Sequence, residues 1–141
     1  MASARLDSET LPVITKHITQ DVINTFEACG ILNRANIHND PELASKRLGT
    51  TYAIASGRMS IAFCTEAMRK FIGAEDFHRS GNVNLKFLRP VKHGDTVSVH
   101  GQVNSRQPQD DGTTMVVVDV YCENQNGDKT AVGQASAVVS G

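Results

Sequence analysis

The sequence lacks a surplus of charge of either sign. Its 141 residues include 14 Lys and Arg against 15 Asp and Glu, which gives a formal net charge of −1. Proteins that bind nucleic acid neutralise phosphates with a basic surface, and this chain contains no cluster of Lys and Arg. We therefore expect no nucleic acid among its partners.

Long hydrophobic runs are missing as well. A helix that crosses a bilayer needs about 20 consecutive apolar residues, and no stretch of the chain approaches that length. Residues 1–10 have no apolar segment of the kind that secretory signals contain. We expect a cytoplasmic protein with no membrane partner, folded as a single domain over residues 1–141, with residues 1–10 flexible.

Metal and cofactor motifs are also absent. Cys29, Cys64 and Cys122 lie too far apart for a CxxC motif, and the histidines show no spacing typical of metal ligands. No glycine-rich nucleotide-binding loop occurs. We therefore expect no metal and no cofactor. The cysteines are predicted to be small core residues, with a nucleophilic Cys64 as the less favoured interpretation.

Three helices are expected in the first half of the chain. Thr19 is a good N-cap for a helix over residues 20–29, and Asn39-Asp-Pro-Glu42 is typical of the start of a helix that ends at Gly49. Residues 57–72 carry apolar side chains at helix-face spacing with small residues beside them. This third helix is predicted to be largely buried.

The second half of the chain is predicted to form strands. Alternating or β-branched residues indicate an edge strand over 11–18 and further strands over 83–87, 97–103, 114–122 and 131–139. Asn126-Gly127 is a strong signal for a tight hairpin. Helices followed by antiparallel strands give an α+β fold, in which the sheet wraps around the central helix at 57–72.

Three segments, in this order, resemble the MaoC-like hot-dog hydratases and dehydratases, which include (R)-specific enoyl-CoA hydratases. Residues 37–42, Ile-His-Asn-Asp-Pro-Glu, are similar to the end of that family's catalytic motif, Asp-x-Asn-Pro-x-His followed by x-Asp-Pro-Glu. Residues 53–57, Ala-Ile-Ala-Ser-Gly, are similar to its Ala-x-Ala-His-Gly opening of the central helix. Residues 84–99 contain Phe87, Arg89-Pro-Val91 and Gly94-Asp95, and they are similar to its strand–turn–strand signature of an aromatic, Arg-x-Pro-Val and Gly-Asp.

The resemblance implies a hot-dog fold, a homodimer whose sheets join, and a small-molecule substrate. Substrates of the family are acyl thioesters of coenzyme A or of an acyl carrier protein, and water is added to or removed from the acyl chain. His38 falls on the catalytic histidine of the motif. The amide of Gly57, at the positive end of a helix, is implied to stabilise the enolate oxygen.

The sequence departs from the family pattern at two positions of the site. Asn33 falls where the motif has its Asp, and Ser56 falls where the family has His before the helix glycine. An amide orients a water or hydroxyl group but does not accept its proton. We therefore expect a divergent lyase that adds or removes water, or carries out a related addition or cyclisation, on an activated intermediate that is thioester-linked or biosynthetic. His38 is expected to act as acid or base, with Asn33 and Ser56 as hydrogen-bonding partners.

Two further residues are candidates for substrate binding. Arg58 falls in the first turn of the central helix, where the helix dipole disfavours a cation. It is interpreted as an anchor for a substrate carboxylate or phosphate, with a solvated surface side chain as the alternative. Tyr52 is predicted to be a core aromatic or to line the pocket.

Two other functions stay open. The chain could be a non-catalytic or partner-dependent subunit, because some hot-dog dehydratases are heterodimers in which one subunit supplies the catalytic residues. It could also be an acyl thioesterase, which needs a base near the central helix. Glu66 is the only acidic residue inside that helix.

Overall fold

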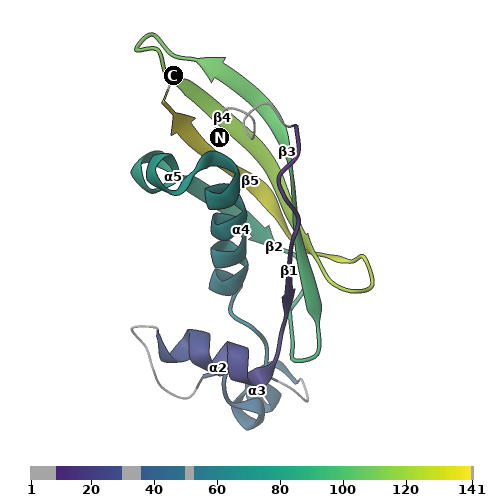
Figure 1. The fold of residues 1–141 in the computed structure, drawn as a ribbon. Coiled ribbons are helices and arrows are strands. Elements are labelled where there is room, and N and C mark those ends of the chain that lie inside the picture. Colours follow the sequence, from purple (N-terminus) through teal and green to yellow (C-terminus); the bar gives the residue numbers. More distant parts are fainter. Residues whose placement is uncertain (1–8, 30–35, 50–52, 141) are drawn as a thin grey trace.

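The computed structural model describes residues 9–29, 36–49 and 53–140, which form four helices and five strands (Figure 1). In chain order these are β1 (Ile14–His17), α2 (Gln20–Ala28), α3 (Pro41–Leu48), α4 (Gly57–Ile72), α5 (Ala74–Ser80), β2 (Asn82–Phe87), β3 (Thr96–Pro108), β4 (Thr114–Glu123) and β5 (Lys129–Val139). The predicted order of helices before most of the strands is confirmed.

The five strands form one antiparallel sheet in the order β1-β3-β4-β5-β2. β4 is central, and alternate side chains along it, from Val116 to Cys122, are buried. β1 and β2 are the two edges, and β2 pairs only with β5 within the described part of the chain. The prediction of an edge strand near the N-terminus and a central strand at 114–122 is confirmed.

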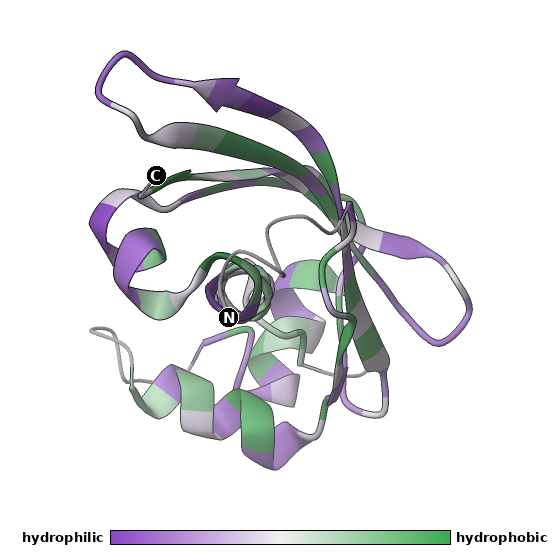
Figure 2. Ribbon diagram, turned by 45° about the horizontal axis from the view of Figure 1, so that its top comes forward, coloured by the Kyte–Doolittle hydropathy of each residue, from purple (hydrophilic) through white to green (hydrophobic). Residues whose placement is uncertain are grey.

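The sheet curves over helix α4, which is seen end-on in Figure 2. Met68 and Phe71 on one face of the helix are almost fully buried among the side chains of the sheet. The other face is open, and Arg58 and Ala62 are exposed. The α+β arrangement is therefore as predicted, but α4 is buried along one face rather than over most of its circumference.

Local signals account for the helix boundaries near the pocket described below. The hydroxyl of Thr19 accepts a hydrogen bond from the amide of Val22 at 3.1 Å, as expected of an N-cap. The carboxylate of Asp40 caps α3 in the same way, and Gly49 ends this helix with a φ of 71°. None of the helices in the described ranges is both long and apolar enough to cross a membrane.

Two features differ from the expectations. Helix α5 was not predicted, since Gly73 precedes it without a side-chain cap and Phe77 is its one buried residue. Cys29 is exposed at the end of α2, so its assignment to the core is wrong. The other two cysteines are in the core, where the sulfur atoms of Cys64 and Cys122 lie 3.7 Å apart.

Candidate functional site

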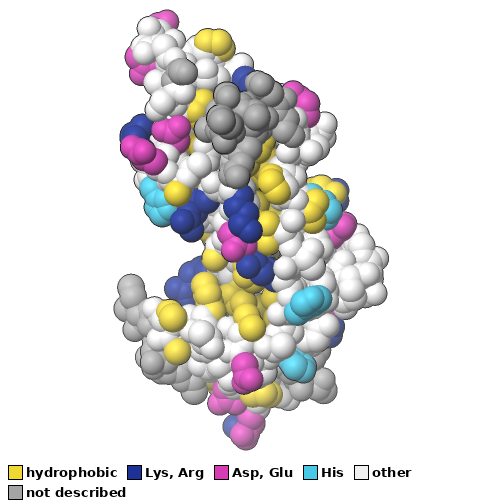
Figure 3. Space-filling model, in the orientation of Figure 1, with side chains coloured by type: hydrophobic (Ala, Val, Ile, Leu, Met, Phe, Trp, Pro, Cys, Tyr) yellow, Lys and Arg dark blue, Asp and Glu magenta, His cyan; other side chains and the backbone are white. Residues whose placement is uncertain are grey.

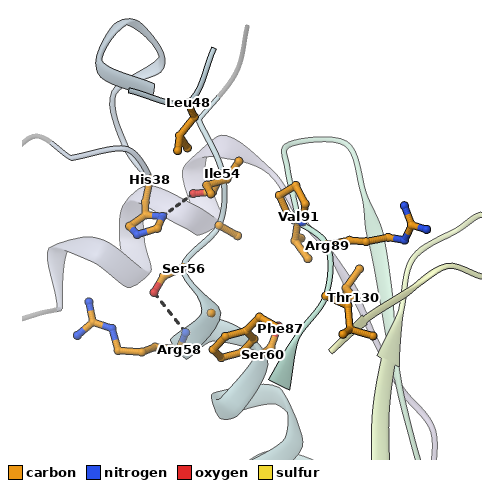
Figure 4. Close-up of a pocket in the computed structure, with 14 residues that line it drawn as sticks. His38, Leu48, Ile54, Ser56, Arg58, Ser60, Phe87, Arg89, Val91 and Thr130 are labelled. Carbon is orange, nitrogen blue, oxygen red and sulfur yellow. Dashed lines mark hydrogen bonds between the residues drawn. The ribbon is translucent and has the colours of Figure 1, made fainter. Parts of the chain in front are cut away.

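A pocket of about 580 Å³ lies where the N-terminus of α4 meets the end of β2 (Figure 4). One wall includes His38, Ser56 and Arg58, and the opposite wall includes Phe87 and Val91. The remaining lining residues are Leu48, Ile54, Ala55, Gly57, Ser60, Leu88, Arg89, Pro90 and Thr130.

Backbone hydrogen bonds join three distant segments around this pocket. The amide of Ile54 donates to the carbonyl of Ile37 at 3.2 Å, and the amide of Ala55 donates to the carbonyl of Val91 at 2.6 Å. The residues that enter α4 therefore run between the loop before α3 and the turn after β2. All three segments that carry the sequence resemblance meet here.

His38 is held with a defined tautomer. Its Nδ1 lies 2.8 Å from the carbonyl oxygen of Ile54, and because a carbonyl only accepts, Nδ1 is the donor. A neutral ring then keeps the lone pair on Nε2, the nitrogen that can accept a proton. The backbone of His38 is fixed too, since its amide donates to the side chain of Asn36 and its carbonyl accepts from Gln20.

The start of α4 offers a backbone donor that has no partner among the residues that the structure describes. Gly57 is the first residue of the helix, so its amide has no acceptor inside the helix. The hydroxyl of Ser56 caps the helix by accepting from the amide of Arg58 at 3.3 Å. The ring of Phe87 covers Gly57 so closely that a Cβ atom at this position would lie 2.7 Å from it. A glycine here lets the pocket wall approach the helix terminus.

Arg58 has a partner that sequence reasoning missed. Its Nη2 lies 3.9 Å from Oε2 of Glu27 in α2, and the Glu27 side chain is only 4% exposed. Oε1 of Glu27 has no hydrogen-bond partner among the described residues. The sequence feature that could have revealed this partner is Glu27 itself, an acidic residue four positions after Ile23 on the apolar face of the predicted helix.

A buried carboxylate holds the turn behind the Val91 wall. Asp95 accepts hydrogen bonds from the amide and ammonium of Lys92 and from the side chain of Gln125, each at 3.0 Å. Burial raises the pKa of Asp95, but these hydrogen bonds and the charge of Lys92 together hold it below its ordinary value. Asp95 is therefore ionised and structural at neutral pH.

Two alternative catalytic residues lie away from the pocket. The contact with Cys122, and then burial, raise the pKa of the Cys64 thiol, so Cys64 stays protonated in the core and is no nucleophile. Glu66 on α4 pairs with Lys16, with 2.9 Å between Oε2 and Nζ. Neither residue lines the pocket.

The pocket thus brings together His38, Ser56, Gly57 and Arg58 from the predicted site. The other two predicted residues, Asn33 and Tyr52, lie outside the described residues. Within the described ranges, no three His, Cys, Asp or Glu side chains lie close enough together to hold a metal ion.

Comparisons with known proteins give the same family as the motifs. The family model described as "MaoC like domain" matches residues 2–126. The chain is 25% identical to the monoamine oxidase regulatory protein from Archaeoglobus fulgidus over 93% of this chain and 88% of that one, with a TM-score of 0.77. No curated protein matches the chain.

Two other solved structures are similar. The chain is 24% identical to the unliganded R-hydratase PhaJ1 from Pseudomonas aeruginosa, over 97% of this chain and 84% of that one, with a TM-score of 0.73. It is 14% identical to a chain of the HadBC (3R-hydroxyacyl-ACP dehydratase) complex from Mycobacterium tuberculosis, over 94% and 98% of the two chains, with a TM-score of 0.70. At these identities the similarity shows a shared fold.

Proposed function

The chain belongs to the family of MaoC-like domains and has their hot-dog fold, and from this premise we propose that it is a lyase that adds water to, or removes it from, an acyl thioester. Hydratases and dehydratases among its structural neighbours support an activity of the dehydratase type. The observation that carries the proposal is the pairing of two groups in one pocket. Nε2 of His38 is the available base, and Gly57 presents a free amide at a helix N-terminus.

His38 alone can supply the acid–base chemistry. In the dehydration direction, Nε2 takes a proton from C2 of a 3-hydroxyacyl thioester, and the C–H electron pair forms the C2=C3 bond. As the C3–O bond breaks, the same proton passes from Nε2 to the leaving hydroxyl, which departs as water. Hydration is the reverse. The proton that the leaving group needs is the one the base has removed, so no second titrating residue is required.

The amide of Gly57 acts on the charge that develops during this step. Removal of the C2 proton places negative charge on the thioester carbonyl oxygen. A backbone N–H at the positive end of a 16-residue helix stabilises that charge without reorganisation. Ser56 and Asn33 are proposed to orient the water or hydroxyl, a role that a neutral amide or hydroxyl side chain can fill.

The rest of the pocket fits an acyl group. Leu48, Phe87, Leu88 and Val91 give it an apolar lining, and an apolar cavity with a few polar groups at one end is typical of a small-molecule site. The substrate is proposed to be a biosynthetic intermediate carried on coenzyme A or on a carrier protein. Tyr52 is proposed to add to this lining.

A second copy of the chain is the proposed partner. Phe87 and Leu88 are 51% and 47% exposed at the end of β2, the strand whose outer edge is unpaired within the described ranges. Pairing two such edges in a homodimer would cover these side chains and close the pocket.

A partner-dependent subunit is the alternative, and one observation favours it. Asn33 stands where the family motif has its Asp, so a sister subunit with the complete motif could supply the chemistry. The similar HadBC structure is itself a complex. An acyl thioesterase is disfavoured, because Glu66 pairs with Lys16 away from the pocket.

One assay separates these functions. The purified chain is incubated with trans-2-enoyl thioesters of coenzyme A from C4 upward, and loss of the enoyl absorbance is followed beside release of free thiol. Loss of absorbance without thiol release supports the lyase. Thiol release would mean a thioesterase, and inactivity that is relieved only by a copurified sister subunit would mean the partner-dependent form.

A further inference from the structure

One face of helix α2 lies behind the pocket and touches it at two points. Gln20, Ile23 and Glu27 follow one another at helical spacing on the buried side of α2. Nε2 of Gln20 donates to the carbonyl of His38 at 3.3 Å. Oε2 of Glu27, two turns further on, lies 3.9 Å from Nη2 of Arg58. The mechanism proposed above uses neither α2 nor this carboxylate.

Burying the carboxylate of Glu27 costs folding free energy unless a partner compensates its charge. The side chain is 4% exposed. Among the described residues, its one ion-pair contact is Arg58, and its Oε1 has no hydrogen-bond partner. Buried polar atoms in folded proteins are nearly always hydrogen-bonded. Uncharged side chains of similar volume often replace buried ion pairs without loss of stability. The buried carboxylate of Glu27, with one long contact to a mostly exposed Arg58, therefore points to a role beyond packing.

Arg58 is placed where a cation gains little from the fold. It sits in the first turn of α4, whose dipole disfavours positive charge, and its side chain is 61% exposed. The 3.9 Å contact to Glu27 is longer than a hydrogen bond, so this carboxylate does not occupy the N–H donors of Arg58. Figure 4 shows the Arg58 side chain extending on the side of the pocket that holds His38 and Ser56.

We propose that Glu27 is a positioning residue that fixes the guanidinium of Arg58 at the edge of the pocket, where its remaining N–H donors bind a carboxylate on the acyl part of the substrate. A long, flexible side chain anchored at one edge loses less freedom when it binds a ligand. The planar fork of a guanidinium matches a carboxylate with two parallel hydrogen bonds. This inference rests on the proposed acyl-thioester function and adds the substrate class, an acyl thioester with a second, free carboxylate.

The position of Arg58 favours a carboxylate of the acyl group over a phosphate of the carrier. Arg58 follows directly after Gly57, whose amide is proposed to hold the thioester oxygen. In coenzyme A and in carrier proteins, the whole pantetheine arm separates the phosphates from the thioester. Figure 3 shows Lys and Arg side chains beside the hollow next to α4, with an acidic side chain between them, so basic groups border this face on several sides.

The test compares two pantetheine thioesters, which contain no phosphate. One carries a crotonyl group, and the other carries the same enoyl group with a terminal carboxylate. Binding of their saturated analogues is measured by calorimetry, which needs no turnover, and kcat and KM are measured where turnover occurs. The wild type is expected to bind the carboxylated thioester at least tenfold more tightly, and Arg58→Ala is expected to lose that preference.

Variants of Glu27 test whether this residue positions the guanidinium of Arg58. Glu27→Gln should weaken binding of the carboxylated thioester severalfold, raise KM more than it lowers kcat, and leave the melting temperature unchanged or higher. Glu27→Asp should restore part of the preference. Glu75→Gln and Arg79→Ala, which break an exposed ion pair of 3.0 Å on α5, are the matched controls and should change nothing.

Each contrary result has one meaning. Equal binding of both thioesters by the wild type overturns the carboxylate site. If the wild type instead prefers coenzyme A esters over pantetheine esters, and Arg58→Ala removes this preference, Arg58 binds a phosphate. Tighter binding by Glu27→Gln, or a lower melting temperature with the preference intact, overturns positioning. An Arg58-dependent preference without any turnover keeps this inference and refutes the lyase.

Discussion

Substitutions of Ser56 test whether the negative charge of the enolate oxygen develops beside the start of α4. Its hydroxyl is the N-cap of the helix, and the residue is 6% exposed. Loss of this cap in Ser56→Ala leaves the amide of Arg58 without its acceptor, which should cost about 1 kcal/mol of folding free energy. For a domain of this size, that corresponds to a fall of about 3 °C in melting temperature.

Asp and Asn at the same position separate stability from catalysis. Both are good N-caps, and the interaction of the Asp charge with the helix dipole offsets the cost of burying that charge, so Ser56→Asp and Ser56→Asn should have similar stabilities. The same charge lies beside the amide of Gly57, where the thioester oxygen becomes negative. At an effective dielectric constant of 20, the Asp carboxylate and the neighbouring enolate oxygen repel by about 3 kcal/mol. This repulsion corresponds to a decrease of about 100-fold in rate.

The assay is enoyl-thioester hydration together with thermal unfolding of the three variants. We expect kcat/KM of the Asp variant to be about 100-fold below that of the Asn variant, with similar melting temperatures for the two variants. Equal kcat/KM values for the stable Asp and Asn variants would refute the placement of the enolate oxygen at the start of α4.

Three more perturbations have defined outcomes. Asn33→Asp should raise hydration of simple enoyl thioesters at least tenfold in the same assay, because a carboxylate can share the proton transfer with His38; no gain would mean that the pocket no longer fits these substrates. Gly133→Ala should lower the urea midpoint strongly or prevent folding, because a Cβ there overlaps the carbonyl oxygen of Asn84. Because the pKa of Asp95 is lower in the folded protein than in the unfolded chain, its ionised carboxylate stabilises the fold at pH values above the unfolded pKa. This contribution should be lost as the pH falls below about 4 and then through the pKa that Asp95 has in the folded protein. Asp95→Asn should flatten that dependence in acid unfolding, and an unchanged slope would contradict the assignment.

Features set by neighbouring residues could be predicted from the sequence. Thr19, Asp40 and Ser56 act as N-caps where short polar side chains precede helical patterns. The β-branched run at 114–122 forms the central strand, and its alternate residues from Val116 to Cys122 are buried. The segments that resemble the family motifs place His38 and Gly57 in one pocket, as the resemblance implied.

Features set by packing between elements could not be predicted. The ion pair of Glu27 with Arg58 depends on how α2 crosses the start of α4, and no local pattern encodes this crossing. The tautomer of His38 depends on the carbonyl of Ile54, 16 residues away. The exposure of Cys29 follows from its place at the end of α2, although the residue type favours a core position.

The most direct test of the account is the dependence of turnover on His38. Hydration of trans-2-enoyl-coenzyme A by the wild type, His38→Ala and the exposed control His78→Ala is followed at neutral pH through the enoyl absorbance. If His38 is the acid and base, the wild type and His78→Ala turn over the substrate, and kcat of a folded His38→Ala protein falls by about 10²–10⁴-fold. Turnover that His38→Ala leaves unchanged would contradict the assignment of His38 as the acid and base of this site.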